Sequence, residues 1–140
     1  MIELFLVGPQ DTVALGRRLA RGLRAGDVVL LEGPLGAGKS ALVRAMLRAL
    51  TGEAGLEVPS PTFTLVQSYE TPIGVVQHFD LWRLEGPAGV RDLGWEEAEV
   101  AFVEWPDRLG TLRPGDALVV ALEYAGEGRL ARLTGWEGRL

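Results

Sequence analysis

The sequence predicts an α/β fold in which helices pack on a sheet with central parallel strands, an inserted β-hairpin and an antiparallel edge. Two fully apolar runs, residues 28–31 and 100–103, are typical of strands buried on both faces of a parallel sheet. A glycine-rich loop and an amphipathic segment follow the first run, which indicates a strand-loop-helix unit. Two pairs of strand-like segments separated by short turn sequences indicate hairpins.

The first predicted helix begins at Asp11 or Thr12, either of which can cap it, and ends at Gly26. Its apolar stripe consists of Leu15, Leu19 and Leu23. Its basic side, which we expect to face solvent, contains Arg17, Arg21 and Arg24. The first apolar strand, residues 28–31, follows directly.

A complete G-x-x-x-x-G-K-[ST] motif then spans residues 33–40. Its glycines let backbone N–H groups turn inward around an anion, and the next helix directs its positive N-terminus at the same place. Lys39, the only lysine of the chain, can reach the outer phosphates of a nucleotide, and the Ser40 hydroxyl can hold Mg²⁺. The motif therefore predicts a P-loop NTPase-like sheet that binds ATP or GTP.

Two other interpretations of this motif are less consistent with the sequence around it. A chance match is conceivable in a chain with 19 glycines, but the flanking strand and helix argue against it. Gly36, Gly38 and Ala41 also form a dinucleotide fingerprint, which requires an acidic residue at the end of a second strand about 20 positions on. The segment 58–62 is a poor strand end, so this reading is disfavoured.

The remaining elements follow in order. A helix starts near Lys39, and a loop covers residues 52–61. Strands over residues 62–69 and 75–82, joined by a turn at 71–74, form the inserted hairpin. A short helix covers residues 87–93, and the central strand 100–103 ends at Glu104. The last two strands, residues 117–123 and 129–134, flank a turn at 125–128 and are expected to form the antiparallel edge.

Length and composition limit the function. The 140 residues are enough for one domain, 1–140, with 47% apolar residues for a core. With no cysteine, thiol catalysis and disulfides are excluded, and no apolar run is long enough to span a membrane. The N-terminus lacks the features of an export signal, so we expect a cytoplasmic protein. A net charge of -5 disfavours strong direct binding of RNA or DNA by the chain as a whole.

Two acids are candidates for the nucleotide site. Glu104 ends a buried parallel strand, where open α/β sheets bind ligands, and is the first choice as a magnesium ligand. Asp80 shares one face of its strand with His78, the only histidine, and either a catalytic or a structural carboxylate fits there. The stiff loop with Ser60 and Thr62 lies where nucleotide switches sense the γ-phosphate, unless it is a simple connection.

Four segments together resemble the TsaE family of bacterial ATPases needed for threonylcarbamoyladenosine formation at position 37 of tRNA. They are residues 33–40, 60–63, 78–84 and 104–107, which occur in the family's order and spacing. The resemblance covers nearly the whole chain. It implies an ATPase with little activity alone, which works with the TsaD and TsaB proteins and has only an indirect involvement with tRNA.

The resemblance also implies roles for individual residues. The loop residues that it implies bind the phosphates are Gly33, Leu35, Gly36, Ala37, Gly38, Lys39 and Ser40. The implied magnesium ligands are Ser40, Glu104 and Asp80. The implied catalytic and switch residues are Lys39, Asp80, Glu104 and Thr62. Gln10 and Thr12 are expected beside the adenine, and Arg132 near the nucleotide.

Three rival functions are considered. A regulatory GTPase needs an N-K-x-D motif, but the chain has no asparagine and its one lysine is already assigned. A small-molecule P-loop kinase would place the phosphate on an acceptor instead of on water. A nucleotide-dependent binding module would hydrolyse nothing and would keep its affinities without Asp80.

Overall fold

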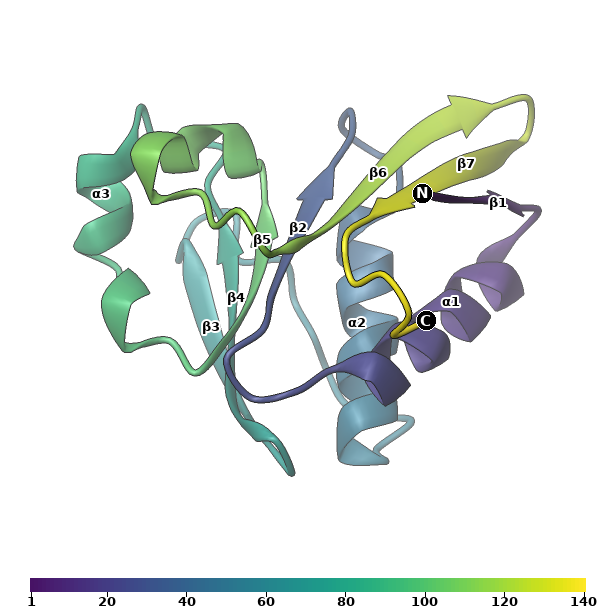
Figure 1. The fold of residues 1–140 in the computed structure, drawn as a ribbon, viewed down its shortest axis with the longest axis horizontal. Helices are drawn as coiled ribbons and strands as arrows, with labels where there is room; N and C mark the ends of the chain where they lie inside the picture. The colour runs from purple at the N-terminus through teal and green to yellow at the C-terminus, as the bar shows by residue number, and fades with distance from the viewer.

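A computed structural model describes residues 1–140 and contains one seven-stranded sheet with the order β1-β7-β6-β2-β5-β4-β3 (Figure 1). The strands are β1 (Ile2–Leu6), β2 (Val28–Glu32), β3 (Val66–Thr71), β4 (Gly74–Asp80), β5 (Val100–Glu104), β6 (Leu118–Ala125) and β7 (Gly128–Thr134). The α-helices are α1 (Pro9–Gly22), α2 (Lys39–Thr51) and α3 (Pro87–Arg91). Two 3₁₀ segments are η1 (Trp95–Glu97) and η2 (Pro106–Leu112).

The centre of the sheet is parallel. Strand β2 lies between β5 and β6 and is parallel to both, and β5 is also parallel to β4. The hairpin β3–β4 is inserted between α2 and β5, as predicted, and only Pro72 and Ile73 separate its strands. The predicted α/β class with central parallel strands and an inserted hairpin is therefore confirmed.

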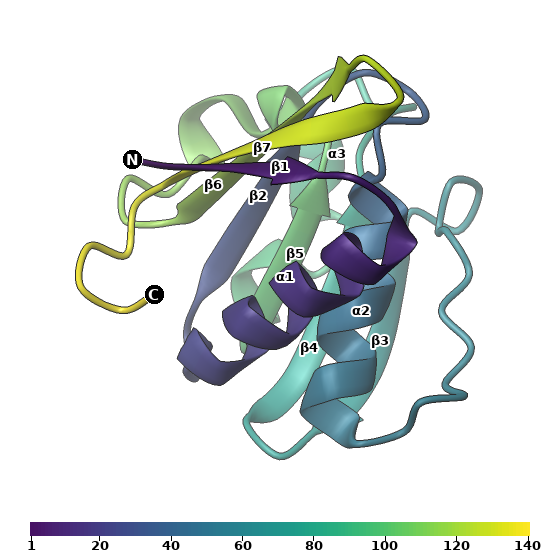
Figure 2. The same cartoon turned by 90° about the vertical axis from the view of Figure 1, so that its right-hand side faces the viewer.

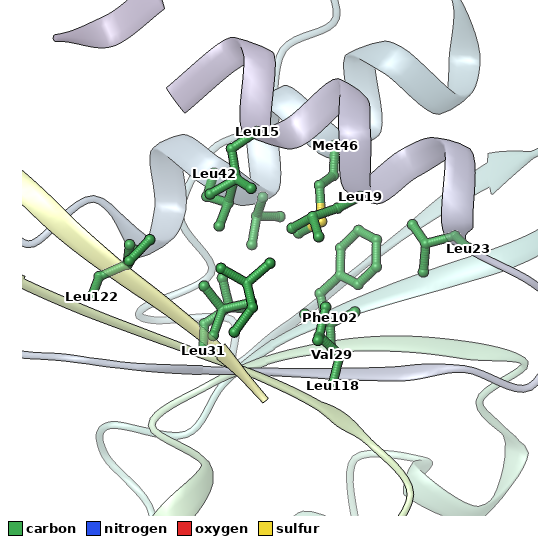
Figure 3. Packing of buried hydrophobic residues seen from close by; sticks show 14 of the residues in the cluster. Leu15, Leu19, Leu23, Val29, Leu31, Leu42, Met46, Phe102, Leu118 and Leu122 are labelled. Carbon is green, nitrogen blue, oxygen red and sulfur yellow. The ribbon is translucent and has the colours of Figure 1, made fainter. Parts of the chain in front are cut away.

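Each face of the sheet has its own apolar core, because side chains alternate along buried strands. Val29 and Leu31 of β2 pack with α1 and α2, whereas Leu30 packs with α3 and η2 on the other face. Figures 1 and 2 show α1 and α2 together on one face. In Figure 3, Leu15 and Leu19 of α1 and Leu23, which follows the helix, point toward the strands, as the predicted apolar stripe requires.

Helices α1 and α2 pack closely on one another at Gly16. A Cβ atom on this glycine would lie 2.4 Å from the Cβ atom of Ala45. The absence of a side chain at Gly16 therefore allows the two helices to approach, which positions the N-terminus of α2 relative to α1.

The first helix differs from its prediction at both ends. It begins at Pro9 after Gly8, which has no side chain to cap it, while Asp11 in the first turn accepts a hydrogen bond from the backbone N–H of Val7 at 2.8 Å. It ends at Gly22 and not at Gly26, because the carboxylate of Asp27 accepts the N–H of Arg24 at 2.7 Å in a turn.

The sheet differs from its prediction in three places. The hairpin β6–β7 is antiparallel as predicted, but β6 also pairs with β2, and β1, which the sequence pattern did not reveal, forms the edge beside β7. Strand β3 begins at Val66 because Leu65 has a left-handed backbone with φ of 71°. Strand β4 stops at Asp80, two residues earlier than predicted.

None of the helices is both long and apolar enough to cross a membrane.

Candidate functional site

The glycine-rich loop connects the carboxyl end of β2 to the first residue of α2. Gly33, Gly36 and Gly38 have φ of 146°, 80° and 107°, a backbone region that favours glycine. A Cβ atom at Gly33 would lie 2.4 Å from the carbonyl oxygen of Leu122, and one at Gly36 would lie 2.7 Å from the hydroxyl of Tyr124. The loop therefore has the open backbone that a phosphate cradle needs.

Lys39 is folded back into this loop. Its Nζ donates hydrogen bonds to the carbonyl oxygens of Gly33 and, at 3.2 Å, of Pro34. Nζ also lies 3.8 Å from the ring centroid of Trp105, a cation-π contact. Burial lowers the pKa of Lys39 below its ordinary value, and the charges of Glu104, Asp80 and Asp107 partly oppose this change. A buried cation with a perturbed pKa is more common at functional sites than elsewhere in a protein.

Glu104 is the centre of a buried polar cluster. Its two carboxylate oxygens accept hydrogen bonds from the Ser40 hydroxyl at 3.1 and 3.0 Å. His78 Nε2 lies 2.6 Å from Oε2 of the same carboxylate. Only 3% of Glu104 and none of His78 is exposed. The strand β5 thus delivers the carboxylate directly to the first turn of α2.

The tautomer of His78 follows from its surroundings. Its Nδ1 is buried and has no hydrogen-bond partner. A buried N–H without a partner is costly, so the proton belongs on Nε2, which donates to Glu104. His78 is therefore a positioning residue for Glu104 in this structure.

Asp80 lies next to Glu104 because the two residues are paired in register across β4 and β5. Its Oδ1 accepts the backbone N–H of Trp82 at 3.1 Å, and its Oδ2 accepts the Thr62 hydroxyl at 3.3 Å. The Thr62 hydroxyl is also 3.0 Å from that of Ser60. The loop of residues 60–63 is thus connected to the carboxylates, which joins three segments far apart in the sequence.

The donor set suits a magnesium ion that is bound mainly through a nucleotide. Ser40, Glu104 and Asp80 present oxygen atoms, which Mg²⁺ prefers. No group of three or more His, Cys, Asp or Glu residues is arranged as a complete metal site. One or two carboxylates with substrate phosphates and water is the usual arrangement for Mg²⁺, so the residues fit this ion.

A pocket of about 840 Å³ lies beside the loop, and Thr12, Ala37, Gly38 and Arg129 are among its lining residues. Thr12 is thus brought to the loop, whereas Gln10 does not line the pocket. The structure also does not bring Arg132 to the loop, since its guanidinium bonds Glu3 and Glu123 at 3.0 and 2.8 Å.

Two functional candidates were missed by sequence reasoning. Arg129 donates to the Gly36 carbonyl at 3.4 Å, and the Tyr124 hydroxyl donates to the Leu35 carbonyl at 2.7 Å. The two residues are paired in register on β6 and β7, and the guanidinium lies 4.5 Å from the tyrosine ring centroid. Only the pairing of the hairpin with β2 brings them to the loop. The resemblance pointed instead to Arg132, three residues further along β7, and no local sequence signal marked Tyr124.

A glycine-rich loop between a central parallel strand and a helix, with an acidic residue ending the adjacent strand, defines the P-loop class of α/β proteins. Within this class, residues 6–132 match the family model described as "Threonylcarbamoyl adenosine biosynthesis protein TsaE". The chain belongs to the TsaE family, a family of tRNA threonylcarbamoyladenosine biosynthesis proteins.

Individual relatives agree with the family match. The chain is 38% identical to the TsaE protein of a Nostoc species over 143 residues, covering 96% of this chain and 86% of the relative. It is 33% identical to the Bacillus subtilis protein of the same name, covering 86% and 77%. The crystal structure of YdiB from Bacillus subtilis is similar with a TM-score of 0.76 and 27% identity, covering 96% of this chain and 84% of that one.

Proposed function

We propose that this protein is a Mg²⁺-dependent ATPase that supports formation of N6-threonylcarbamoyladenosine at position 37 of tRNAs reading codons that start with A. It acts in the cytoplasm with the TsaD and TsaB proteins, and its ATP binding and hydrolysis support their turnover. The observation that carries the proposal is the convergence of Lys39, Ser40, Glu104 and Asp80 at the carboxyl ends of adjacent strands. Membership of the TsaE family supplies the pathway.

Each residue of the site has a separate role in phosphoryl transfer, a reaction that depends mainly on positioning and charge stabilisation. The loop N–H groups bind the phosphates, and Lys39 exchanges its carbonyl partners for the outer phosphate oxygens. Ser40 and Glu104 would hold Mg²⁺, which would supply positive charge against the phosphates. Thr12 and the adjoining pocket residues lie beside the base.

Asp80 is suited to orient the attacking water. Both oxygens of Glu104 are already engaged by Ser40 and His78, whereas Asp80 has one weak contact to Thr62 at 3.3 Å beyond its backbone hydrogen bond. Water would attack the γ-phosphorus as the bond to the ADP oxygen breaks, and its proton would pass to solvent, so that ADP, phosphate and a proton are the products. Movement of the Thr62 loop would change the freedom of Asp80 to take part.

A partner at the mouth of the site fits the exposed apolar side chains there. Leu35 in the loop, Phe63 after Thr62 and Trp82 after Asp80 are 78%, 82% and 46% exposed. Large apolar side chains gathered around a functional site are typical of protein interaction surfaces. The partner would complete the site, and we therefore expect weak activity from the chain alone.

The test is ATP hydrolysis by the pure chain with Mg²⁺, with and without the TsaB and TsaD proteins of the same organism. We expect stimulation by the partners that is lost in Lys39→Ala. Full turnover by the chain alone, unchanged by partners, would overturn the partner role. Phosphate found on an acceptor other than water would identify a kinase, and nucleotide binding without hydrolysis would identify a binding module.

A further inference from the structure

The pocket beside the P-loop extends well beyond the part that a base and ribose need. Its volume of about 840 Å³ is near the top of the range of roughly 300–1,000 Å³ for complete ligand sites. Its lining follows α2 from Ala41 to Gly52, which is about 17 Å at 1.5 Å per residue. The pocket is therefore a groove along α1 and α2, with the nucleotide loop at one end.

The two helices that form this groove are basic, although the chain is acidic. Together α1 and α2 hold six of the 14 basic residues and one of the 19 acidic residues. They lie side by side on one face of the sheet, which faces the viewer in Figure 2. The face formed by α1 and α2 is therefore basic, although the net charge of the chain is -5.

The arginines of this face have no carboxylate partners. None of the five arginines of α1 and α2 forms an ion pair, whereas five arginines elsewhere in the chain do. The groove is lined by three of them, Arg17, Arg44 and Arg48. Arg48 also donates a hydrogen bond from Nε to the Leu56 carbonyl at 3.0 Å. Glu127, the one acidic lining residue, belongs to the β6–β7 turn at the loop end.

The floor of the groove favours a phosphate backbone over a protein segment. Away from the loop it is lined by small residues, which are Ala45, Ala49, Gly52 and Ala54. No aromatic residue lines it, although aromatic anchors are typical of protein interfaces and of base-stacking sites. Arg44 and Arg48 are four residues apart on one helix face, about 6 Å along the axis, so they can contact successive anionic groups.

We infer that the groove between α1 and α2 binds the sugar-phosphate backbone of RNA through Arg17, Arg44 and Arg48. The contact is independent of base sequence, because phosphate contacts position a nucleic acid without reading it. Assigning tRNA as this RNA depends on the proposed function. The binding is weak and sensitive to salt, since the rest of the chain is acidic.

The test measures fluorescence anisotropy of a labelled tRNA transcript with the full chain, without nucleotide, over a series of salt concentrations. The groove variant is Arg17→Gln/Arg44→Gln, which leaves Arg48 and its hydrogen bond intact. The matched control is Arg91→Gln/Arg113→Gln, which removes the same charge from arginines outside the groove. Circular dichroism and thermal unfolding establish that all three proteins are folded.

We expect the groove variant to bind about tenfold more weakly at low salt, with the slope of log K against log salt smaller by about two, one for each lost contact. The control should bind within about twofold of the unsubstituted chain. The inference is overturned if that chain binds no tRNA, or if both variants weaken equally. It is also overturned if the groove variant loses only the TsaB and TsaD proteins, since a protein then occupies the groove.

The Lys39→Ala variant separates this inference from the proposed function. Lys39 does not line the groove, so the variant should retain tRNA binding while it loses ATP hydrolysis. Loss of tRNA binding in Lys39→Ala would place the RNA at the P-loop and would contradict the inference. Absent ATPase activity with groove-dependent tRNA binding would refute the proposed function alone.

Discussion

At the scale of single residues, the site depends on buried contacts between strands and helix α2. Glu104 is paired with Asp80 across the sheet, bonded to Ser40 at the start of α2 and held by His78 from β4. A second hydrogen-bonded partner is a common way to orient a carboxylate that binds a metal. The histidine therefore acts on the site through Glu104.

Replacing His78 tests this positioning role. In His78→Ala the Glu104 carboxylate loses its partner at 2.6 Å, and we expect the Mg²⁺ concentration for half-maximal nucleotide binding to rise about tenfold. His78→Gln retains an N–H donor and should recover part of this loss. Fluorescent-nucleotide titrations with and without Mg²⁺ provide the measurement. A Mg²⁺ dependence that is the same in all three proteins would refute the role.

Lys39 makes folding stability depend on alkaline pH. Burial lowers its pKa in the folded chain below 10.5, so between that pKa and 10.5 the unfolded chain binds more protons. Below the pKa of Lys39 in the folded chain, the buried ammonium destabilises the fold by its full amount. This destabilisation disappears as pH rises to 10.5, so the free energy of unfolding increases over that range. Lys39→Met lacks this increase. Urea unfolding across this range should therefore show the unsubstituted chain gaining stability relative to the variant, and parallel curves would contradict this explanation.

At the scale of elements, the contact between α1 and α2 depends on a missing side chain. Alanine favours a helix over glycine by up to about 1 kcal/mol, yet a Cβ atom at Gly16 would lie 2.4 Å from that of Ala45. We expect Gly16→Ala to lower the free energy of unfolding by about 1–3 kcal/mol, the usual cost of overpacking. Urea denaturation followed by circular dichroism measures it.

Gly55→Ala is the control for this substitution, because a Cβ atom there would have no neighbour within 4 Å. Its free energy of unfolding should remain close to that of the unsubstituted chain. An increase in stability in Gly16→Ala would mean that the helices can separate without loss, and the close packing would then have no energetic role.

At the scale of the whole molecule, charge is distributed unevenly around the sheet. The face with α1 and α2 holds most of the unpaired arginines, while the carboxylates of the site come from the ends of β4 and β5. Net charge is a sum over the surface and does not reveal this separation. The expectation of little direct contact with RNA follows from the sum, and the basic groove follows from its distribution.

The sequence predicted those parts that depend on neighbouring residues. The P-loop from Gly33 to Ser40 could be identified because the backbone conformation and the lysine it needs are local. Strand β5 could be predicted together with Glu104 because a fully apolar run ending in an acid has a characteristic pattern. The edge strand β1 could not be predicted, because its partner β7 is more than 120 residues away in the sequence.

By itself the sequence determined the α/β class, the phosphate loop and the candidate acids, since each is written in short-range spacing and periodicity. Only the tertiary structure decided that His78 holds Glu104 and that Arg129, not Arg132, reaches the loop. It also decided that arginines from α1, α2 and β7 line one groove. The physical reason is that strand order and helix packing select which distant residues become neighbours. Those choices depend on burial over the whole chain, and no local pattern encodes them.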